Sequence, residues 1–145
     1  MTLPAAAAVL VPSGTAVVWP SDVHAATRVR AMPSGTTVAL ADRRPGGRGR
    51  LRRAAGRLEV RIDAEYLVLP TWRMGTFVVS DDPDAVRWLV ETFVTTPPRV
   101  ALGHALADGA ARLGRRAADS RTGAAAVQRL LGALVPGRLV IGTRT

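Results

Sequence analysis

The sequence of 145 residues contains no lysine, no asparagine and no cysteine, and only 4% of its side chains are aromatic. Without cysteine, disulfides, thiolate metal sites and cysteine nucleophiles are excluded. Without lysine, a Walker A loop, a protein-kinase core and Schiff-base catalysis are excluded. No apolar run reaches the roughly 20 residues that span a bilayer, and the N-terminus lacks the basic segment of a signal peptide. We therefore expect a cytoplasmic protein without a membrane span, a cofactor or a bound metal.

All 20 basic residues are arginines, and the formal net charge is +9. Seven of them lie in segment 43–57, which reads RRPGGRGRLRRAAGR and has no acidic residue. A chain rich in alanine, arginine and glycine but without lysine and asparagine is typical of a GC-rich genome, so codon usage is an alternative explanation for this excess. The segment predicts an exposed Arg/Gly-rich loop that joins two strands as a hairpin. Its candidate anion-binding residues are Arg43, Arg44, Arg48, Arg50, Arg52, Arg53 and Arg57.

This arginine-rich segment has three interpretations. It could bind the phosphates of nucleic acid, with a steep dependence on salt. It could lie on an anionic membrane surface, or bind an acidic glycan or nucleotide phosphates. It could also be a solvated loop without a ligand. No aromatic residue lies between Trp19 and Tyr66, and no known nucleic-acid-binding motif accompanies the charge. The sequence therefore favours the solvated loop. An anionic ligand remains an alternative, and binding to nucleic acid is disfavoured but not excluded.

The first half of the chain is typical of strands and turns. Pro12-Ser13-Gly14-Thr15 precedes AVVW and Pro33-Ser34-Gly35-Thr36 precedes TVAL, which predicts two similar β-units. Between them, Ser21 is the expected cap of a short helix over 22–31. Further strands are expected at 36–41, 58–62, 66–69 and 76–79.

The second half of the chain is typical of helices. Asp82 is the expected N-cap of a helix with Pro83 at its first position. Two more helices are expected, around Leu102–Leu113 and from Gly123 onward. The sequence predicts a single α+β domain over 1–145, in which two or three C-terminal helices pack on a mostly antiparallel sheet from the N-terminal half. A final strand is expected at 138–142, unless the chain is the front part of a longer protein.

The remaining polar candidates are few. His24 and His104 lie far apart in sequence, and no GxSxG motif accompanies them, so no catalytic residue is predicted. Asp81, Asp82 and Asp84 form an acidic cluster that could hold Mg²⁺. Capping of a helix N-terminus explains the same three residues more simply.

The segment around Pro70 holds four large side chains. Tyr66 and Phe77 are expected to fill the core. Trp72 and Arg73 lie in a loop between two strands, and we expect them to be exposed and to contact a protein or ligand.

The same segment carries a family resemblance. EYLVLP at 65–70, the residues 71–73 and TFVV at 76–79 resemble the N-terminal region of large actinobacterial proteins of cell-surface polysaccharide synthesis. RLVIGTR at 138–144 is similar to the strand at which the phosphotransferase-like domain of those proteins begins. The resemblance implies an accessory front domain whose partner is another protein or a downstream catalytic domain.

Three functions follow from these observations. The first is a non-catalytic accessory or interaction domain associated with a bacterial glycan- or phosphoryl-transfer enzyme. The second is a small nucleic-acid-binding protein that uses the arginine-rich segment. The third is a small transferase or hydrolase with a site near Asp81–Asp84.

Overall fold

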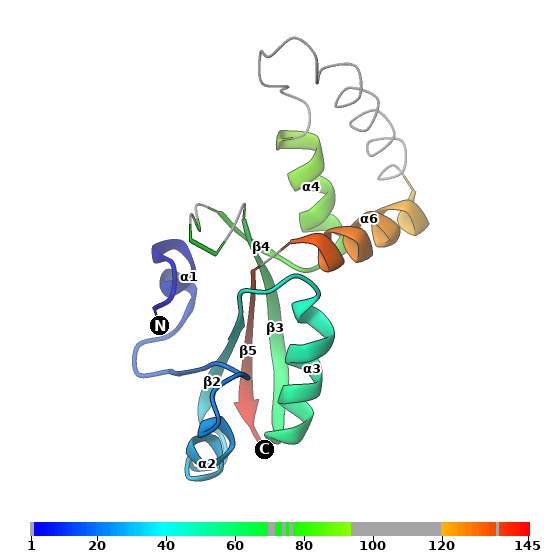
Figure 1. Ribbon diagram of the computed structural model, residues 1–145. Helices are drawn as coiled ribbons and strands as arrows, with labels where there is room; N and C mark the ends of the chain where they lie inside the picture. The colour runs from blue at the N-terminus through cyan, green and yellow to red at the C-terminus, as the bar shows by residue number, and fades with distance from the viewer. Residues whose placement is uncertain (1, 70–71, 74, 76, 94–119, 136) are drawn as a thin grey trace. The chain divides into compact units, whose positions relative to one another are not determined.

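The computed structural model describes all residues except 1, 70–71, 74, 76, 94–119 and 136 (Figure 1). Its contacts divide the chain into two compact units where the sequence predicts a single domain. The first unit holds residues 1–80 with 132–145, and the second holds residues 81–131. The helix expected around Leu102–Leu113 and His104 lie outside the described residues. Within the described part of the chain, no helix is long and apolar enough to cross a bilayer.

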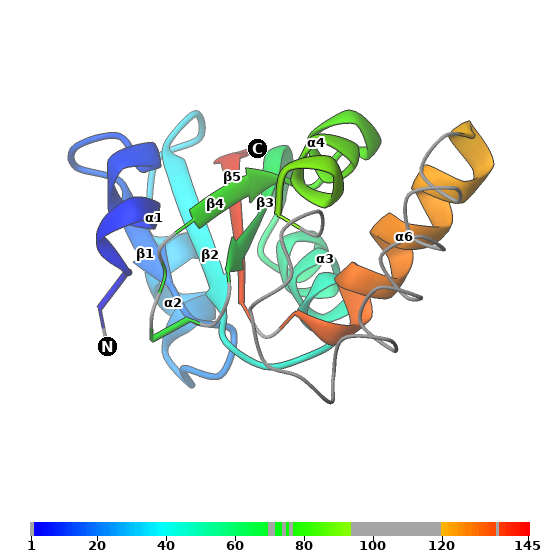
Figure 2. The ribbon, with the colours of Figure 1, turned by 90° about the horizontal axis from the view of Figure 1, so that it is seen from above.

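The first unit is built on a five-stranded sheet with the strand order β1-β2-β5-β3-β4 (Figure 2). Strand β1 pairs with β2 in parallel, and the other three pairs are antiparallel. The predicted α+β fold, with its mostly antiparallel sheet and its C-terminal strand, is confirmed. The strands are β1 (Ala16–Val18), β2 (Thr37–Asp42), β3 (Val60–Leu69), β4 (Phe77–Ser80) and β5 (Arg138–Arg144).

The two similar β-units are confirmed. Each Pro-Ser-Gly-Thr turn leads into a strand, with Gly14 and Gly35 at φ of 81° and 84°, where glycine meets no steric penalty. The two strands, β1 and β2, lie side by side in parallel, and helix α2 (Ala25–Arg30) connects them. The sequence predicts that Ser21 caps α2, and this prediction is wrong. Instead the carboxylate of Asp22 accepts a hydrogen bond from the backbone N–H of His24 over 2.9 Å.

Segment 43–57 is not the exposed hairpin loop that its glycines suggest. Residues Gly47–Arg57 form helix α3. Arginine, alanine and leucine are strong helix formers, and buried residues recur at helical spacing along this segment. These buried residues are Leu51, Ala54, Ala55 and Leu58.

Strands β2 and β3 do not form a hairpin either, because β5 lies between them. Both are antiparallel to β5, so they run parallel to each other. Parallel strands need a long crossover rather than a tight turn, and α3 supplies it. This arrangement depends on β5 at the C-terminus, and no local pattern in segment 43–57 predicts it.

Helices cover both faces of the sheet. Helices α2 and α3 pack on one face, where Val29 and Leu51 meet Val38, Leu40 and Val140. Helix α1 (Ala5–Leu10) lies on the opposite face (Figure 1). The hydrophobic core between α1 and the sheet contains Ala7, Trp19, Ala39, Ala41, Val68, Trp72 and Leu139.

A β-bulge in β3 changes which side chains face which core. The pairing with β5 shifts between Ile62 and Ala64. Val60 and Ile62, which precede the shift, pack on the α3 side of the sheet. Tyr66 and Val68, which follow it, pack on the α1 side. Successive side chains of a strand alternate between faces, so one extra residue reverses the parity. The bulge thereby places Glu65 on the same face as α3.

The second unit contains helix α4 (Pro83–Phe93) and most of helix α6 (Arg121–Leu134). As predicted, Asp82 caps α4, because its Oδ1 accepts a hydrogen bond from the backbone N–H of Ala85 over 2.8 Å. The third predicted helix is present as α6. It begins before Gly123, whose N–H donates to the hydroxyl of Ser120 over 3.0 Å.

Candidate anion-binding site

Helix α3 carries its arginines in two rows. Arg48 and Arg52 are four residues apart and lie on one side of the buried stripe. Arg50, Arg53 and Arg57 are three and four residues apart and lie on the other side. Residues at these spacings neighbour one another on a helix surface. The one helix therefore presents two separate lines of guanidinium groups, and their surroundings differ.

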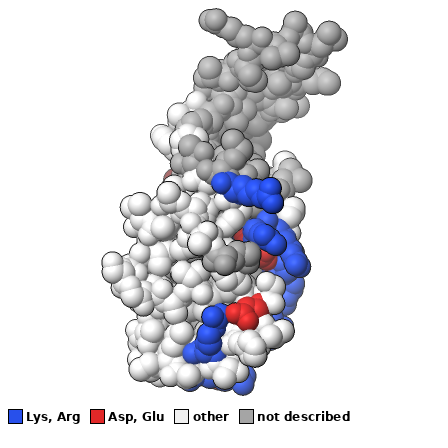
Figure 3. Space-filling view, turned by 60° about the vertical axis from the view of Figure 1, so that its left-hand side comes forward, with Lys and Arg blue, Asp and Glu red and all other residues white. Residues whose placement is uncertain are grey.

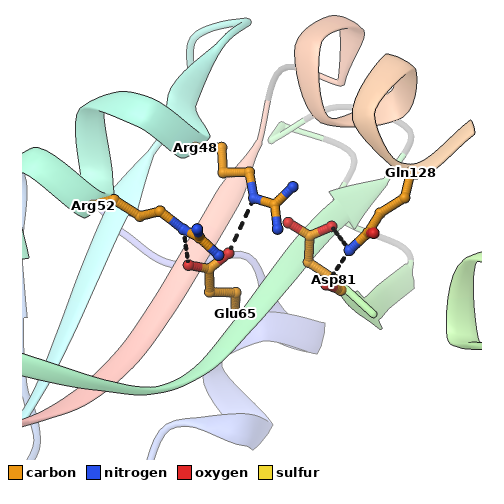
Figure 4. Close-up of polar contacts among 5 residues, drawn as sticks. All are labelled: Arg48, Arg52, Glu65, Asp81 and Gln128. Carbon is orange, nitrogen blue, oxygen red and sulfur yellow. Dashed lines mark hydrogen bonds and ion pairs between the residues drawn. The ribbon is translucent and has the colours of Figure 1, made fainter. Parts of the chain in front are cut away.

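The first row is bound to the sheet. The Nε of Arg52 lies 2.6 Å from one carboxylate oxygen of Glu65, and the Nε of Arg48 lies 3.5 Å from the other (Figure 4). The Glu65 side chain is only 10% exposed, so this double ion pair is shielded from solvent on the carboxylate side. These two arginines, both predicted to bind an anion, already have a carboxylate within the fold.

Arg50, the first residue of the second row, is bound to the end of β2. Its Nε donates to Oδ2 of Asp42 over 2.7 Å. Its Nη2 donates to the backbone oxygens of Arg44 and Pro45 over 3.0 and 2.8 Å. The other carboxylate oxygen of Asp42 accepts the backbone N–H of Arg44 over 2.9 Å. Arg50 and Asp42 thus fix the turn between β2 and α3, and neutralise each other.

The second row lines a pocket of about 310 Å³. Strands β1 and β2 are parallel, so their carboxyl ends meet at one edge of the sheet, where ligands commonly bind in α/β structures. Figure 3 shows arginine side chains gathered along one side of the first unit. The pocket is lined by Trp19, Pro20, Ser21, Ala41, Asp42, Arg43, Arg44, Arg50, Arg53 and Arg57.

The pocket has a strong excess of positive charge. Five arginines face one aspartate, which leaves a formal charge of four positive after the Asp42–Arg50 pair cancels. Within the part of the chain that the structure describes, the guanidinium groups of Arg43, Arg53 and Arg57 form no hydrogen bond or ion pair. Each guanidinium carries five N–H donors and matches phosphate or carboxylate oxygens in a bidentate arrangement. The arrangement is suited to binding an anion.

The ring of Trp19 does not offer a stacking platform to this pocket. It packs edge to face against Trp72, with ring centroids 5.2 Å apart and an interplanar angle of 77°. Both rings belong to the core on the α1 side of the sheet. Among the described residues that line this pocket, Trp19 is the one aromatic residue, and because it is only 9% exposed a base would find almost no ring surface to stack on.

The predicted exposure of Trp72 is wrong. Its side chain is 9% exposed, and its Nε1 donates to the backbone oxygen of Thr2 over 3.4 Å. Arg73 is exposed, as expected. Tyr66 packs against the core as predicted, whereas Phe77 is 43% exposed. Phe77 lies on β4, an edge strand of the sheet, so fewer neighbours cover it.

The acidic cluster has structural partners in the second unit. Asp82 caps α4, and Asp81 is buried beside Gln128 of α6 (Figure 4). The Nε2 of Gln128 donates to the backbone oxygen of Asp81 over 2.6 Å and to its Oδ1 over 3.1 Å. Among the described residues, no three histidine or carboxylate side chains converge as metal ligands. Capping and a buried amide contact therefore account for Asp82 and Asp81, and Asp84 lies in the first turn of α4.

Sequence reasoning missed the β1 half of the pocket. Trp19, Pro20 and Ser21 follow β1, and Asp42 ends β2. The repeated Pro-Ser-Gly-Thr turns were the available signal, because two equivalent strands in parallel end at the same edge. Comparison with protein-family models, with curated proteins and with solved structures gives no match to this chain.

Proposed function

We propose that this chain is a non-catalytic binding domain whose arginine pocket, defined by the ten lining residues above, binds a phosphate-bearing ligand. The observation that carries the proposal is a group of guanidinium donors at the carboxyl edge of β1 and β2, those of Arg43, Arg53 and Arg57, which have no hydrogen-bond or ion-pair partner among the described residues. Uncompensated cations gathered in one cavity repel one another, and a dianion relieves this repulsion.

A phosphate-bearing ligand is consistent with the expected role beside a glycan- or phosphoryl-transfer enzyme, because such enzymes act on phosphate esters. In that case the domain would hold a substrate, product or regulator for its partner. The same charge supports the nucleic-acid alternative less well, since Trp19, the one aromatic residue among the described residues of the pocket lining, is only 9% exposed.

The proposal is tested by titrating the chain with inorganic phosphate and pyrophosphate by calorimetry, at low and at moderate salt. The informative variant is Arg53→Ala combined with Arg57→Ala. A hydrogen bond to a charged group contributes about 1.5–3 kcal/mol, so losing both residues is expected to weaken binding roughly 100-fold.

The matched control is Arg30→Ala combined with Arg73→Ala. Both residues are exposed and lie outside the pocket lining, so the pair removes the same charge elsewhere. The control should retain binding within about threefold, because exposed charges at a distance are screened by salt. Equal losses in the two double variants, or no binding by the unmodified chain, would overturn the proposal.

A further inference from the structure

A second cavity adjoins the arginine pocket. It has a volume of about 370 Å³ and is lined by Val17, Trp19, Ser21, Asp22 and Arg28. Trp19 and Ser21 belong to the linings of both cavities. The two cavities therefore lie next to each other, and a ligand that reached from one to the other would pass these two residues.

The chemistry of the second cavity differs from that of the first. Its two charged residues, Asp22 and Arg28, form an ion pair with each other, so the lining has no net charge. A second phosphate would have no net electrostatic gain there, because the Asp22 carboxylate repels it while Arg28 attracts it. An apolar group would remove water from both charged side chains and would offer no hydrogen bonds in its place.

The ion pair leaves both hydrogen-bond donors and acceptors for a ligand. The Asp22 carboxylate accepts from the His24 N–H and from Arg28, whereas two carboxylate oxygens offer about four acceptor positions. The Arg28 guanidinium carries five N–H donors, and among the described residues it donates to Asp22. Adjacent donors and acceptors of this kind match a hydroxyl group, which both donates and accepts.

The second cavity is also held rigidly. The backbone N–H of Asp22 donates to the oxygen of Trp19 over 2.9 Å, and that of Ala25 donates to the oxygen of Asp22 over 3.0 Å. Ala25 and Val29 anchor α2 in the core beneath. Polar side chains that are already positioned lose little entropy when a ligand binds.

We infer that the ligand of the arginine pocket is a phosphorylated polyol, such as a sugar phosphate, whose hydroxyl groups bind the Asp22–Arg28 pair. This inference rests on the phosphate site proposed above. It excludes a bare inorganic anion as the preferred ligand, because such an anion leaves the second cavity unused.

The test compares ethyl phosphate, a monoester without hydroxyl groups, with glucose 1-phosphate, glucose 6-phosphate and ribose 5-phosphate. At least one sugar phosphate is expected to bind about tenfold more tightly than ethyl phosphate, the factor that one hydrogen bond to a charged group contributes. In Asp22→Asn this difference should disappear. Ethyl phosphate itself should bind the variant as tightly as before or more tightly, because a negative charge near the phosphate is removed.

The outcomes separate the two proposals. If ethyl phosphate binds the unmodified chain through Arg53 and Arg57 but no sugar phosphate binds more tightly, the inference about the second cavity is overturned and the phosphate site stands. Retention of the tenfold difference in Asp22→Asn would overturn the inference in the same way. If ethyl phosphate does not bind at all, the phosphate site itself is wrong.

Discussion

The two arginine rows of α3 come from one uninterrupted stretch of sequence, yet they differ in what surrounds them. Arg48 and Arg52 face Glu65, a carboxylate of β3 that is 10% exposed. Arg53 and Arg57 face a cavity that holds one carboxylate, and Arg50 already pairs with it. Both rows come from the same arginine-rich segment, so the local sequence does not distinguish them. The position of each carboxylate decides which arginines are structural and which remain for a ligand.

The largest expected effect comes from disturbing the bulge that places Glu65. A Cβ on Gly142 would lie 2.3 Å from the backbone oxygen of Arg61 and 2.7 Å from Cγ1 of Val60. Gly142→Ala therefore forces β3 and β5 apart opposite the bulge, and should lower the free energy of unfolding by roughly 3 kcal/mol. Urea denaturation followed by circular dichroism measures this. An unchanged midpoint would show that the bulge does not depend on this glycine.

Removing the carboxylate itself has the next largest effect. Glu65→Gln removes the charge that pairs with Arg48 and Arg52, and should reduce the free energy of unfolding by about 1–2 kcal/mol. Phosphate affinity should remain within a factor of about two, because neither arginine lines the pocket. The matched control is Glu59→Gln, the same chemical change at an exposed position, with an expected effect below about 0.5 kcal/mol.

A smaller change of opposite sign is expected within α3. Gly56 lies in the helix, and a Cβ there meets no atom within 4 Å. Gly56→Ala should raise the free energy of unfolding by up to about 1 kcal/mol, since glycine is a poor helix former. Both arginine rows should stay in place, so phosphate affinity should not change. A large gain or loss of affinity would mean that the helix does not position the pocket arginines as described.

The smallest effect concerns acid stability at the bulge. The hydroxyl of Thr143 donates to the Asp63 carboxylate over 2.6 Å, and Arg61 donates over 3.0 Å. Chiefly because of the Thr143 hydrogen bond, and then that of Arg61, the pKa of Asp63 lies below its ordinary value of 3.8.

The direction of the pH dependence follows from this shift. A lowered pKa in the folded state gives stability that is present above pH 3.8 and is lost as the pH falls through the folded-state pKa. Asp63→Asn and Thr143→Val should each lower the stability slightly at pH 7 and flatten its loss below pH 4, so that the variants and the unmodified chain converge in acid. Thermal melts between pH 2.5 and pH 7 measure the slope. Steeper acid denaturation in either variant would contradict the assignment.

Much of the fold could be predicted because it follows from local signals. The repeated turns with Gly14 and Gly35, the Asp82-Pro83 helix start and the apolar run of the C-terminal strand were interpreted correctly. Each depends on backbone preferences or on periodicity within a few residues. The helix over Gly47–Arg57 was missed because its glycines and charges outweighed the spacing of four buried side chains.

The candidate site could be predicted only in part, for a different reason. All five pocket arginines were among the seven candidates, since composition alone identifies a cationic segment. Nothing in the segment separates Arg52 from Arg53. Their roles differ because Glu65, thirteen residues after Arg52, lies on the face that α3 covers.

The amino-acid sequence by itself determined the class of fold, the concentration of arginines in segment 43–57 and the exclusion of lysine- and cysteine-dependent chemistry. The tertiary structure decided the rest. Insertion of β5 between β2 and β3 converts an expected hairpin into a crossover helix. The bulge at Asp63 then turns Glu65 toward one arginine row, and the parallel pairing of β1 and β2 brings Ser21 to the other. These are contacts between segments distant in the chain, and local preferences do not encode them.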